Sequence, residues 1–400
     1  MNNPQHEGAQ HAASLPRQVK LFGVVSLLND FASEMVYPLL PAFVTGVLGG
    51  GAAALGALDG AADAAAALIK FVSGRFADRP ARRGPLIVIG YLVAAAVRPV
   101  IAATAWAWQV IALRVIDRLG KGLRTPPRDA LIADVTPAPL VGRAFGLQRG
   151  LDHTGAIIGP LVAWYLLAHG ADVRRVILAS FVPGALVVLL AMWAVKEGGG
   201  RRKMPEDAGG LPASFGALRP PPAPVIAIAL FYMLRMPETL MILRAQNLGV
   251  PVALIPLLWA LLHVVRSSTS FLGGGLSDQI GAARTMWIGW LCYVALAAGM
   301  ALAASTMMAW IVFLALGVVA GLTESPERAL VTAATKGHRG SAFGVYHGLT
   351  GVAALVGGIA LGVVFQRASG TVAFVVSAIG ALVLAILWPF WSRAGKVPPQ

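Results

Sequence analysis

The sequence is poor in charged residues and in cysteine. Only 12% of its 400 residues are Asp, Glu, Lys or Arg, whereas 57% are hydrophobic, and the mean hydropathy is +0.72. This balance excludes an ordinary soluble domain, because so few charges cannot keep such an apolar chain in water. Cysteine occurs once, as Cys292, so no disulfide can form within the chain.

The sequence patterns of common catalytic sites are missing as well. The chain contains no P-loop, no nucleophile elbow and no Cys or His cluster with metal-ligand spacing. We therefore expect no metal, no other cofactor, no enzymatic activity and no ATP-driven pumping. The net charge of +14 does not predict a nucleic-acid partner, because the basic residues lie in short segments between apolar runs.

Long apolar runs dominate the rest of the sequence. A membrane-spanning helix needs about 20 mostly apolar residues, and twelve such runs are present, six on each side of a polar stretch rich in Gly and Pro. We therefore predict an all-α membrane protein with twelve transmembrane helices in two pseudo-symmetric six-helix bundles. The bundles cover 19–195 and 225–392, with a linker at 196–224 and tails at 1–18 and 393–400. The predicted spans are 19–47, 55–73, 85–103, 106–126, 143–168, 176–195, 225–246, 252–276, 286–302, 306–322, 341–366 and 371–391.

The distribution of Arg and Lys predicts the orientation. Most basic residues fall on one side of the predicted spans, and only Arg174, Arg175, Arg244 and Arg367 fall on the other. By the positive-inside rule, both termini and the linker then lie in the cytoplasm. The first 18 residues lack the order of a cleaved signal peptide, so we expect the first span to act as the membrane anchor. We expect a multi-pass protein of the inner (cytoplasmic) membrane, surrounded by the lipid bilayer.

Short motifs recur in the two halves of the chain at nearly constant spacing. A duplicated six-span unit gives two bundles related by an axis along the membrane normal, with the substrate site between them near mid-membrane. The recurring pairs are GRFAD at 74–78 with GGLSD at 274–278, GRAFG at 142–146 with GSAFG at 340–344, and Pro127 with Pro326, at offsets of 200, 198 and 199 residues.

One of these repeats carries a known signature. The segment 74–83, GRFADRPARR, resembles the loop motif G-x-x-x-D-R-x-G-R-R of the major facilitator superfamily, with Ala81 in place of the second glycine. The copy at 274–284 retains that glycine as Gly281. The resemblance implies a transporter in which the two loops latch one conformation and their first glycines let helices approach closely. The implied latch residues are Gly74, Asp78, Arg79, Arg82, Gly274, Asp278 and Arg284.

Two more segments resemble motifs of the same family. In the fourth span, RVIDRLG at 114–120 is similar to R-x-x-Q-G-x-G, with Asp117 and Arg118 at the Gln and first Gly positions. In the fifth span, Gly155, Gly159 and Pro160 resemble the G-x-x-x-G-P motif that the family associates with antiporters. The resemblance covers residues 18–392. Ordinary packing of small residues between helices is the alternative explanation of the two glycines.

Ionisable residues inside the predicted spans are candidates for function. Each costs about 2.5 to 3.5 kcal/mol to insert, so each needs a partner, water or a role. The sixth, ninth and twelfth spans carry none, and Arg98 is the exception in the third, where we expect snorkelling or a local break. The others are expected to line a central aqueous space and to bind substrate or carry protons. They are Asp30, Glu34, Asp59, Asp63, Arg114, Asp117, Arg149, Asp152, Arg235 and Glu238.

The first helix carries the strongest candidates. Asp30 and Glu34 are four residues apart and so share one helix face, where mutual repulsion favours proton binding by one of them. We predict that they couple protons or bind cargo, with Arg114 as counter-ion. A fixed ion-pair network between the first and fourth helices is the alternative. In the seventh helix, Pro237 beside Glu238 is a candidate break.

Together these features predict a secondary active transporter that exports a small molecule in exchange for protons by alternating access. A proton-coupled importer is the main alternative, and a membrane sensor that binds a ligand without moving it is the second. We expect a monomer. Cationic, zwitterionic and anionic substrates all remain open, because acidic and basic side chains are nearly balanced within the spans.

Overall fold

The computed structural model describes residues 15–77, 80–137, 140–198, 223–333 and 339–394, and its regular elements are all helical. The linker and tail segments 199–222, 1–14 and 395–400 lie outside the described residues. In the first half of the chain the helices are α1 (Arg17–Val36), η1 (Tyr37–Leu39), α2 (Leu40–Ala42), η2 (Phe43–Val47), α3 (Ala52–Ala77), α4 (Pro80–Val100), η3 (Ile101–Ala103), α5 (Ala107–Val135), α6 (Val141–Ala168), α7 (Val173–Ala179) and α8 (Phe181–Gly198). In the second half they are α9 (Ala223–Leu234), α10 (Glu238–Asn247), η5 (Val252–Leu254), α11 (Ile255–Ile280), α12 (Ala282–Leu302), α13 (Thr306–Ala333), α14 (Arg339–Arg367) and α15 (Gly370–Ala394).

Ten helical stretches in the described part of the chain are long and apolar enough to cross a membrane. They include α7 with α8 as one stretch and α9 with α10 as another. Helices α1 and α5 fall outside this set although they have 20 and 29 residues, and both carry several charged side chains. The chain is therefore a multi-pass, all-helical membrane protein.

The helix bounds correct the sequence prediction at two places. Helix α5 continues to Val135 and α13 to Ala333, about three turns past the predicted span ends at 126 and 322. Prolines lie inside both helices, at Pro126 and Pro127 and at Pro326, so they do not end the helix as the sequence reading assumed. The predicted break at Pro237 is confirmed, since α9 ends at Leu234 and α10 begins at Glu238.

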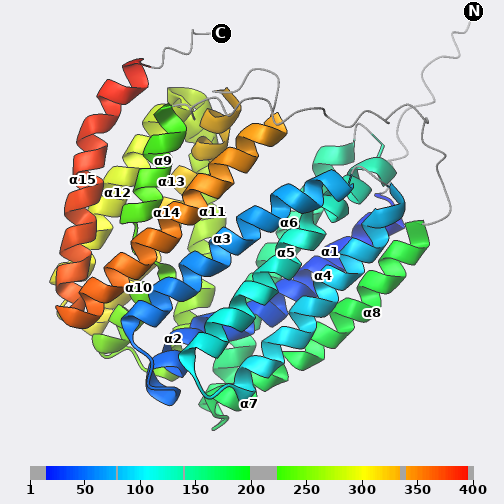
Figure 1. The fold of residues 1–400 in the computed structure, drawn as a ribbon, viewed down its shortest axis with the longest axis horizontal. Helices are drawn as coiled ribbons and strands as arrows, with labels where there is room; N and C mark the ends of the chain where they lie inside the picture. The colour runs from blue at the N-terminus through cyan, green and yellow to red at the C-terminus, as the bar shows by residue number, and fades with distance from the viewer. Residues whose placement is uncertain (1–14, 78–79, 138–139, 199–222, 334–338, 395–400) are drawn as a thin grey trace, which may run out of the picture.

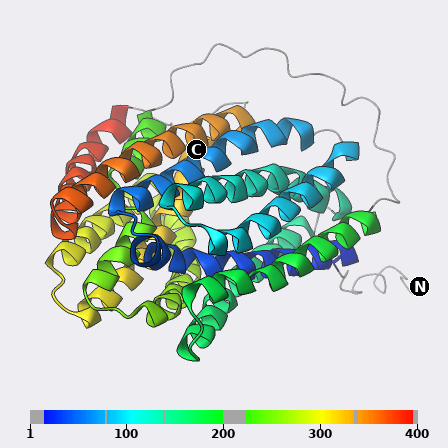
Figure 2. The same cartoon turned by 60° about the horizontal axis from the view of Figure 1, so that its bottom comes forward.

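The two halves of the chain lie side by side (Figure 1). Helices α1 to α8 occupy one side of the picture and α9 to α15 the other, and the turned view in Figure 2 agrees. Within the halves, α1 packs on α6, α3 on α5, α4 on α5 and α8, α11 on α13, and α12 on α13 and α15. The main contacts between the halves are α3 with α14 and α6 with α11.

Glycines bring the paired backbones together. A Cβ on Gly56 of α3 would lie 1.9 Å from the carbonyl oxygen of Gly358 on α14, so neither helix has room for a side chain there. On α6, a Cβ on Gly155 or Gly159 would lie 2.1 or 2.4 Å from a backbone oxygen of α1. Gly155 and Gly159 therefore let α6 pack closely on α1, and the antiporter role of the motif stays a prediction.

Gly274 makes no close helix contact within the described part of the chain, so its predicted packing role stays a prediction. A Cβ there would meet no described atom within 4 Å, whereas one on the preceding Gly273 would lie 2.0 Å from the carbonyl oxygen of Gly321 on α13. The close approach thus belongs to the neighbouring glycine, which lies on a different face of α11 because consecutive helical residues are rotated by about 100°.

Helix α6 offers a matched test of the glycine contact. Gly155→Ala places a methyl group against the α1 backbone and should lower stability by about 1–3 kcal/mol. Gly150→Ala in the same helix meets nothing within 4 Å and should leave stability unchanged or raise it by about 0.5–1 kcal/mol, because alanine favours helix. Thermal unfolding of both purified variants in detergent, followed by tryptophan fluorescence, measures the difference. Equal midpoints would refute the contact.

Candidate functional site

A polar contact joins α1 to α11 across the two halves of the chain. The Glu34 carboxylate on α1 accepts a hydrogen bond of 2.9 Å from the indole N–H of Trp259 on α11. The His263 Nε2 atom, one turn further along α11, lies 3.8 Å from the same carboxylate oxygen. Both rings of this contact are buried, and Tyr37 packs against Trp259 at 5.0 Å. Glu34 therefore lies at the interface between the halves, and its coupling role stays a prediction.

A second polar contact joins α3 to α10, also across the halves. One oxygen of Asp59 accepts from the Tyr37 hydroxyl at 3.0 Å, and the other accepts from both the backbone N–H and the hydroxyl of Thr239, at 3.1 and 2.8 Å. Asp63, one turn further along α3, is exposed and forms no ion pair or hydrogen bond with the described residues. Asp59 and Asp63, both predicted site residues, therefore have different surroundings in the structure.

The fourth-span residues form a buried network within the first half. Asp117 binds Arg98 at 3.0 Å and Arg114 at 3.2 Å, and all three side chains are at most 4% exposed. Arg98 also donates to the backbone and side-chain oxygens of Asn29 on α1. The expectation that Arg98 snorkels is therefore wrong, because it is buried and fully engaged. Its carboxylate partner lies 19 residues away in sequence, which a span-by-span reading does not reveal.

Arg114 is not the direct counter-ion of the α1 carboxylates. Its ion pair is with Asp117, and its guanidinium lies 4.7 Å from the centre of the Tyr37 ring. Asp30 accepts instead from the Asn29 side chain at 2.9 Å. Arg118, one turn after Arg114, interacts electrostatically with Glu34. Helices α1 and α5 are linked instead through Asn29, which accepts from Arg124 of α5 at 3.2 Å, and through Ser26, which accepts from Arg128 of α5 at 3.1 Å.

Residues of α6 complete the first-half side of the site. Asp152 accepts from the Gln148 side chain at 2.6 Å and interacts electrostatically with Asp30. His153, which is exposed, interacts electrostatically with His263 and Asp30, so it faces the second half of the chain. Arg149 lies one turn before His153 on the same helix face and is also exposed. The glycine contact of α6 with α1 is what brings these side chains near Asp30.

The second half contributes a cluster around the break between α9 and α10. Glu238 pairs with Arg235 at 3.4 Å and lies 3.7 Å from Arg266 of α11. Arg266 also forms an ion pair with Glu324 of α13. This cluster joins the predicted pair Arg235 and Glu238 to two further helices.

Sequence reasoning missed Glu324 and Glu327. Glu327 is only 2% exposed and accepts hydrogen bonds from Tyr232 of α9 at 3.2 Å and Tyr346 of α14 at 2.9 Å. Both acids follow the predicted end of the tenth span at 322, where the segment TESPER was read as a loop. The signal that could have found them is the repeat itself, because Pro326 matches Pro127, which also lies inside a long charged helix.

The latch residues are only partly described. Asp78 and Arg79 lie outside the described residues, as do the side chains of Arg82 and Asp278, while Gly74 falls in α3 and Arg284 is exposed near the start of α12. The neighbouring Arg83 forms an ion pair with Asp134 at the end of α5. The latch role stays a prediction.

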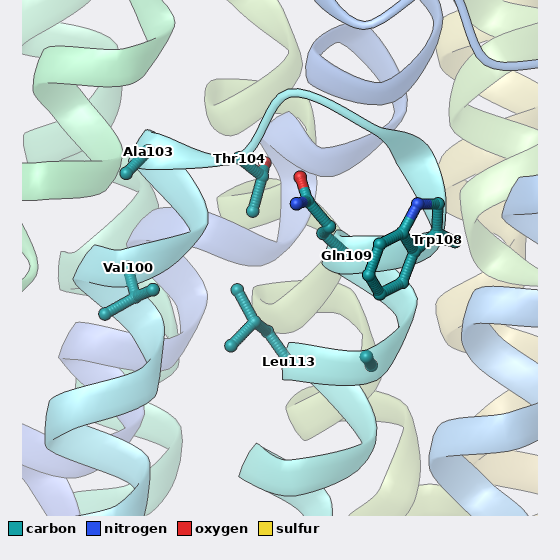
Figure 3. Close-up of a pocket in the computed structure, with 7 residues that line it drawn as sticks. Val100, Ala103, Thr104, Trp108, Gln109 and Leu113 are labelled. Atoms are coloured by element: carbon teal, nitrogen blue, oxygen red, sulfur yellow. The ribbon is translucent and has the colours of Figure 1, made fainter.

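The pockets found on the structure lie away from these residues. Figure 3 shows one of about 290 Å³ between the end of α4 and the start of α5. Val100, Trp108, Gln109 and Leu113 are among its lining residues, and none of the predicted site residues is. Among the described residues, no group of three or more His, Cys, Asp or Glu side chains could hold a metal ion.

The buried network around Asp117 predicts a large stability effect. Arg98→Met removes one partner of a buried carboxylate and should cost about 3–5 kcal/mol of unfolding free energy. Arg175→Met at the start of α7 removes a pair whose side chains are 76% and 61% exposed, and should cost less than about 1 kcal/mol. Thermal unfolding of the two variants in the same detergent compares them. A small effect at Arg98 would show that the network is hydrated or dispensable.

Comparison with known proteins covers most of the chain. The family model of the Major Facilitator Superfamily matches residues 22–346. An uncharacterized MFS-type transporter of Methanocaldococcus jannaschii is 28% identical over 94% of this chain and 95% of its own length. Multidrug resistance protein MdtH of Edwardsiella ictaluri is 32% identical, but over only 45% of this chain and 44% of its own.

Solved structures show the same fold. A point mutant of the nucleoside transporter NupG superposes with a TM-score of 0.75 over 94% of this chain and all of its own, at 14% identity. A bacterial homologue of the lysosomal transporter Spinster, solved in an inward-facing and unoccupied conformation, superposes with a TM-score of 0.71 over 97% of this chain and all of its own, at 16% identity. With the family model matching most of its length, this chain belongs to the major facilitator superfamily of membrane transporters.

Proposed function

We propose that this protein is a secondary active transporter that exports a small molecule in exchange for protons. The observation that carries the proposal is the contact of Glu34 with Trp259 and His263, because it places two titratable groups from opposite halves of the chain against each other. Twelve spans form two six-helix bundles over 19–195 and 225–392. The bundles rock about the interface that holds this contact.

The contact can link proton binding to this movement. An ionised Glu34 attracts a protonated His263 and accepts from the Trp259 N–H. When Glu34 takes a proton from water, an O–H bond forms, its negative charge is lost and the attraction between the bundles weakens. The proton returns to water on the other side of the membrane after the bundles have rearranged. Cargo that binds in place of the proton then moves in the opposite direction.

The proposed direction of transport rests on similarity to a multidrug resistance protein and on one motif. The match to multidrug resistance protein MdtH covers less than half of this chain, and G-x-x-x-G-P is present at 155–160. A proton-coupled importer uses the same residues with cargo and proton moving together. Arg and Lys asymmetry supports cytoplasmic termini and an inner-membrane location, and a monomer suffices for this mechanism.

Proton exchange can be tested in proteoliposomes that contain a pH-sensitive dye. A panel of cationic, zwitterionic and anionic small molecules is added outside vesicles that hold the full chain. We expect at least one compound to move protons in the direction opposite to its own movement. Glu34→Gln keeps an oxygen that accepts from Trp259 but cannot ionise, so it should lower compound-driven proton flux at least tenfold.

Glu197→Gln is the matched control, because it makes the same chemical change at the end of α8, where Glu197 pairs with Arg17. It should leave the flux at the wild-type level. Proton movement in the same direction as the compound would replace export by import. Silence across the whole panel, with correctly folded protein, would favour a sensor and refute transport.

A further inference from the structure

Helix α10 starts without a cap from its own sequence. Its N-cap residue is Pro237, which makes no side-chain cap hydrogen bond, and it follows the break after α9. The first N–H groups of any helix lack intrahelical partners and carry a partial positive charge. Here the carboxylate of Asp59 accepts from the N–H of Thr239, at the second position of α10. Asp59 belongs to α3, so the cap is supplied by the other half of the chain.

Apart from Asp59, the groups in this contact are buried and mostly uncharged. Thr239 is fully buried, and its hydroxyl lies 2.8 Å from Asp59 and 3.2 Å from the carbonyl oxygen of Leu55. Gly56, one turn before Asp59, and Gly60, the residue directly after it, let the α14 backbone approach α3 so closely that a Cβ on either would clash. The halves are therefore in direct backbone contact around Asp59. Helix α10 lies towards the lower end of the molecule in Figure 1, opposite the last turns of α15.

We propose that Asp59 is a positioning residue that keeps this end of the transporter closed by capping α10, and that protonation of Asp59 opens it. The proposal deepens the proposed function and rests on it, because it takes the two bundles to alternate. A proton from water forms an O–H bond on Asp59. The neutral carboxyl is a weaker acceptor for the two Thr239 donors, and it no longer neutralises the positive end of α10.

The groups that face Asp59 favour such a switch. Asp63 on α3 and Glu238 on α10 are the neighbouring negative charges that act on Asp59. Tyr37 of η1 donates to the ionised form, and Arg114 of α5 lies against the Tyr37 ring. The α14 residues in contact near Asp59, Leu355 and Gly358, are uncharged. The ionised state is thus held by the Thr239 and Tyr37 donors and by the helix end.

Distance measurements between spin labels can test the proposal. Labels at Val47→Cys and Arg367→Cys, two exposed positions from opposite halves, are introduced into the full chain in lipid nanodiscs with Cys292→Ser. Asp59→Ala should raise the ratio of the long-distance to the short-distance population about fivefold, the effect expected from loss of one helix cap. Acidification should cause the same change in the wild type. In Asp59→Ala, acidification should cause a smaller change than in the wild type, because only the Glu34 contact still titrates between the halves.

Asp172→Ala is the matched control. Asp172 is also an N-cap aspartate, but it caps α7 within its own half by accepting from the Arg175 N–H at 2.8 Å. Its removal should leave the distances and their pH dependence at the wild-type values. Thr239→Val removes one of the two donors and should give a smaller shift in the same direction as Asp59→Ala.

The outcomes separate this proposal from the proposed function. Wild-type distances in Asp59→Ala at both pH values, or an equal shift in Asp172→Ala, would overturn the cap as a gate. If Asp59→Ala does not fold, Thr239→Val and the pH dependence of the wild type replace it. Wild-type distances in Thr239→Val and no change with pH in the wild type would then overturn the cap as a gate. An opening that depends on Asp59, in a protein that moves no protons with any compound, would support the gate and refute proton-coupled export.

Discussion

The structure depends on one constraint: a charged side chain in an apolar medium must be matched by an opposite charge or by hydrogen-bond donors and acceptors. Asp117 meets it with two arginines from α4 and α5, and Glu34 meets it with donors from the other half of the chain. The first solution joins helices within one half. The second joins the halves, so in the proposed mechanism a change in its protonation acts on their relative position.

Glycine contacts decide which charged faces meet. The glycines of α6 allow that helix to pack closely on α1, and this packing brings the Asp152 region near Asp30. The glycines of α3 do the same against α14, beside the Asp59 and Thr239 contact. In both places, glycines on one helix face let two helices approach closely. This close approach sets the distance between ionisable groups on another face of the same helix. Helix packing and candidate chemistry are therefore parts of the same arrangement.

The two polar contacts between the halves differ in the part of the second half that binds the carboxylate. Glu34 is bound by side chains of a continuous helix, α11. Asp59 is bound at the start of α10, directly after a break, where a small change in backbone direction moves the whole segment. A carboxylate at a helix end can thus influence the break itself. This difference fits the roles proposed above, in which the Glu34 contact takes part in proton exchange and the Asp59 contact closes one end of the transporter.

Composition and motif spacing alone determined that the chain is a helical membrane protein of the major facilitator superfamily, because apolar length and the repeated loop signature are local properties of the sequence. They also predicted the break at Pro237 and made Glu34 a candidate residue, since proline chemistry and burial cost can be read residue by residue. Only the tertiary structure decided the partners: Arg98 with Asp117, Glu34 with Trp259, and Asp59 with Thr239. Those pairs join residues from 19 to 225 positions apart in sequence, and no local pattern encodes which helices will lie side by side.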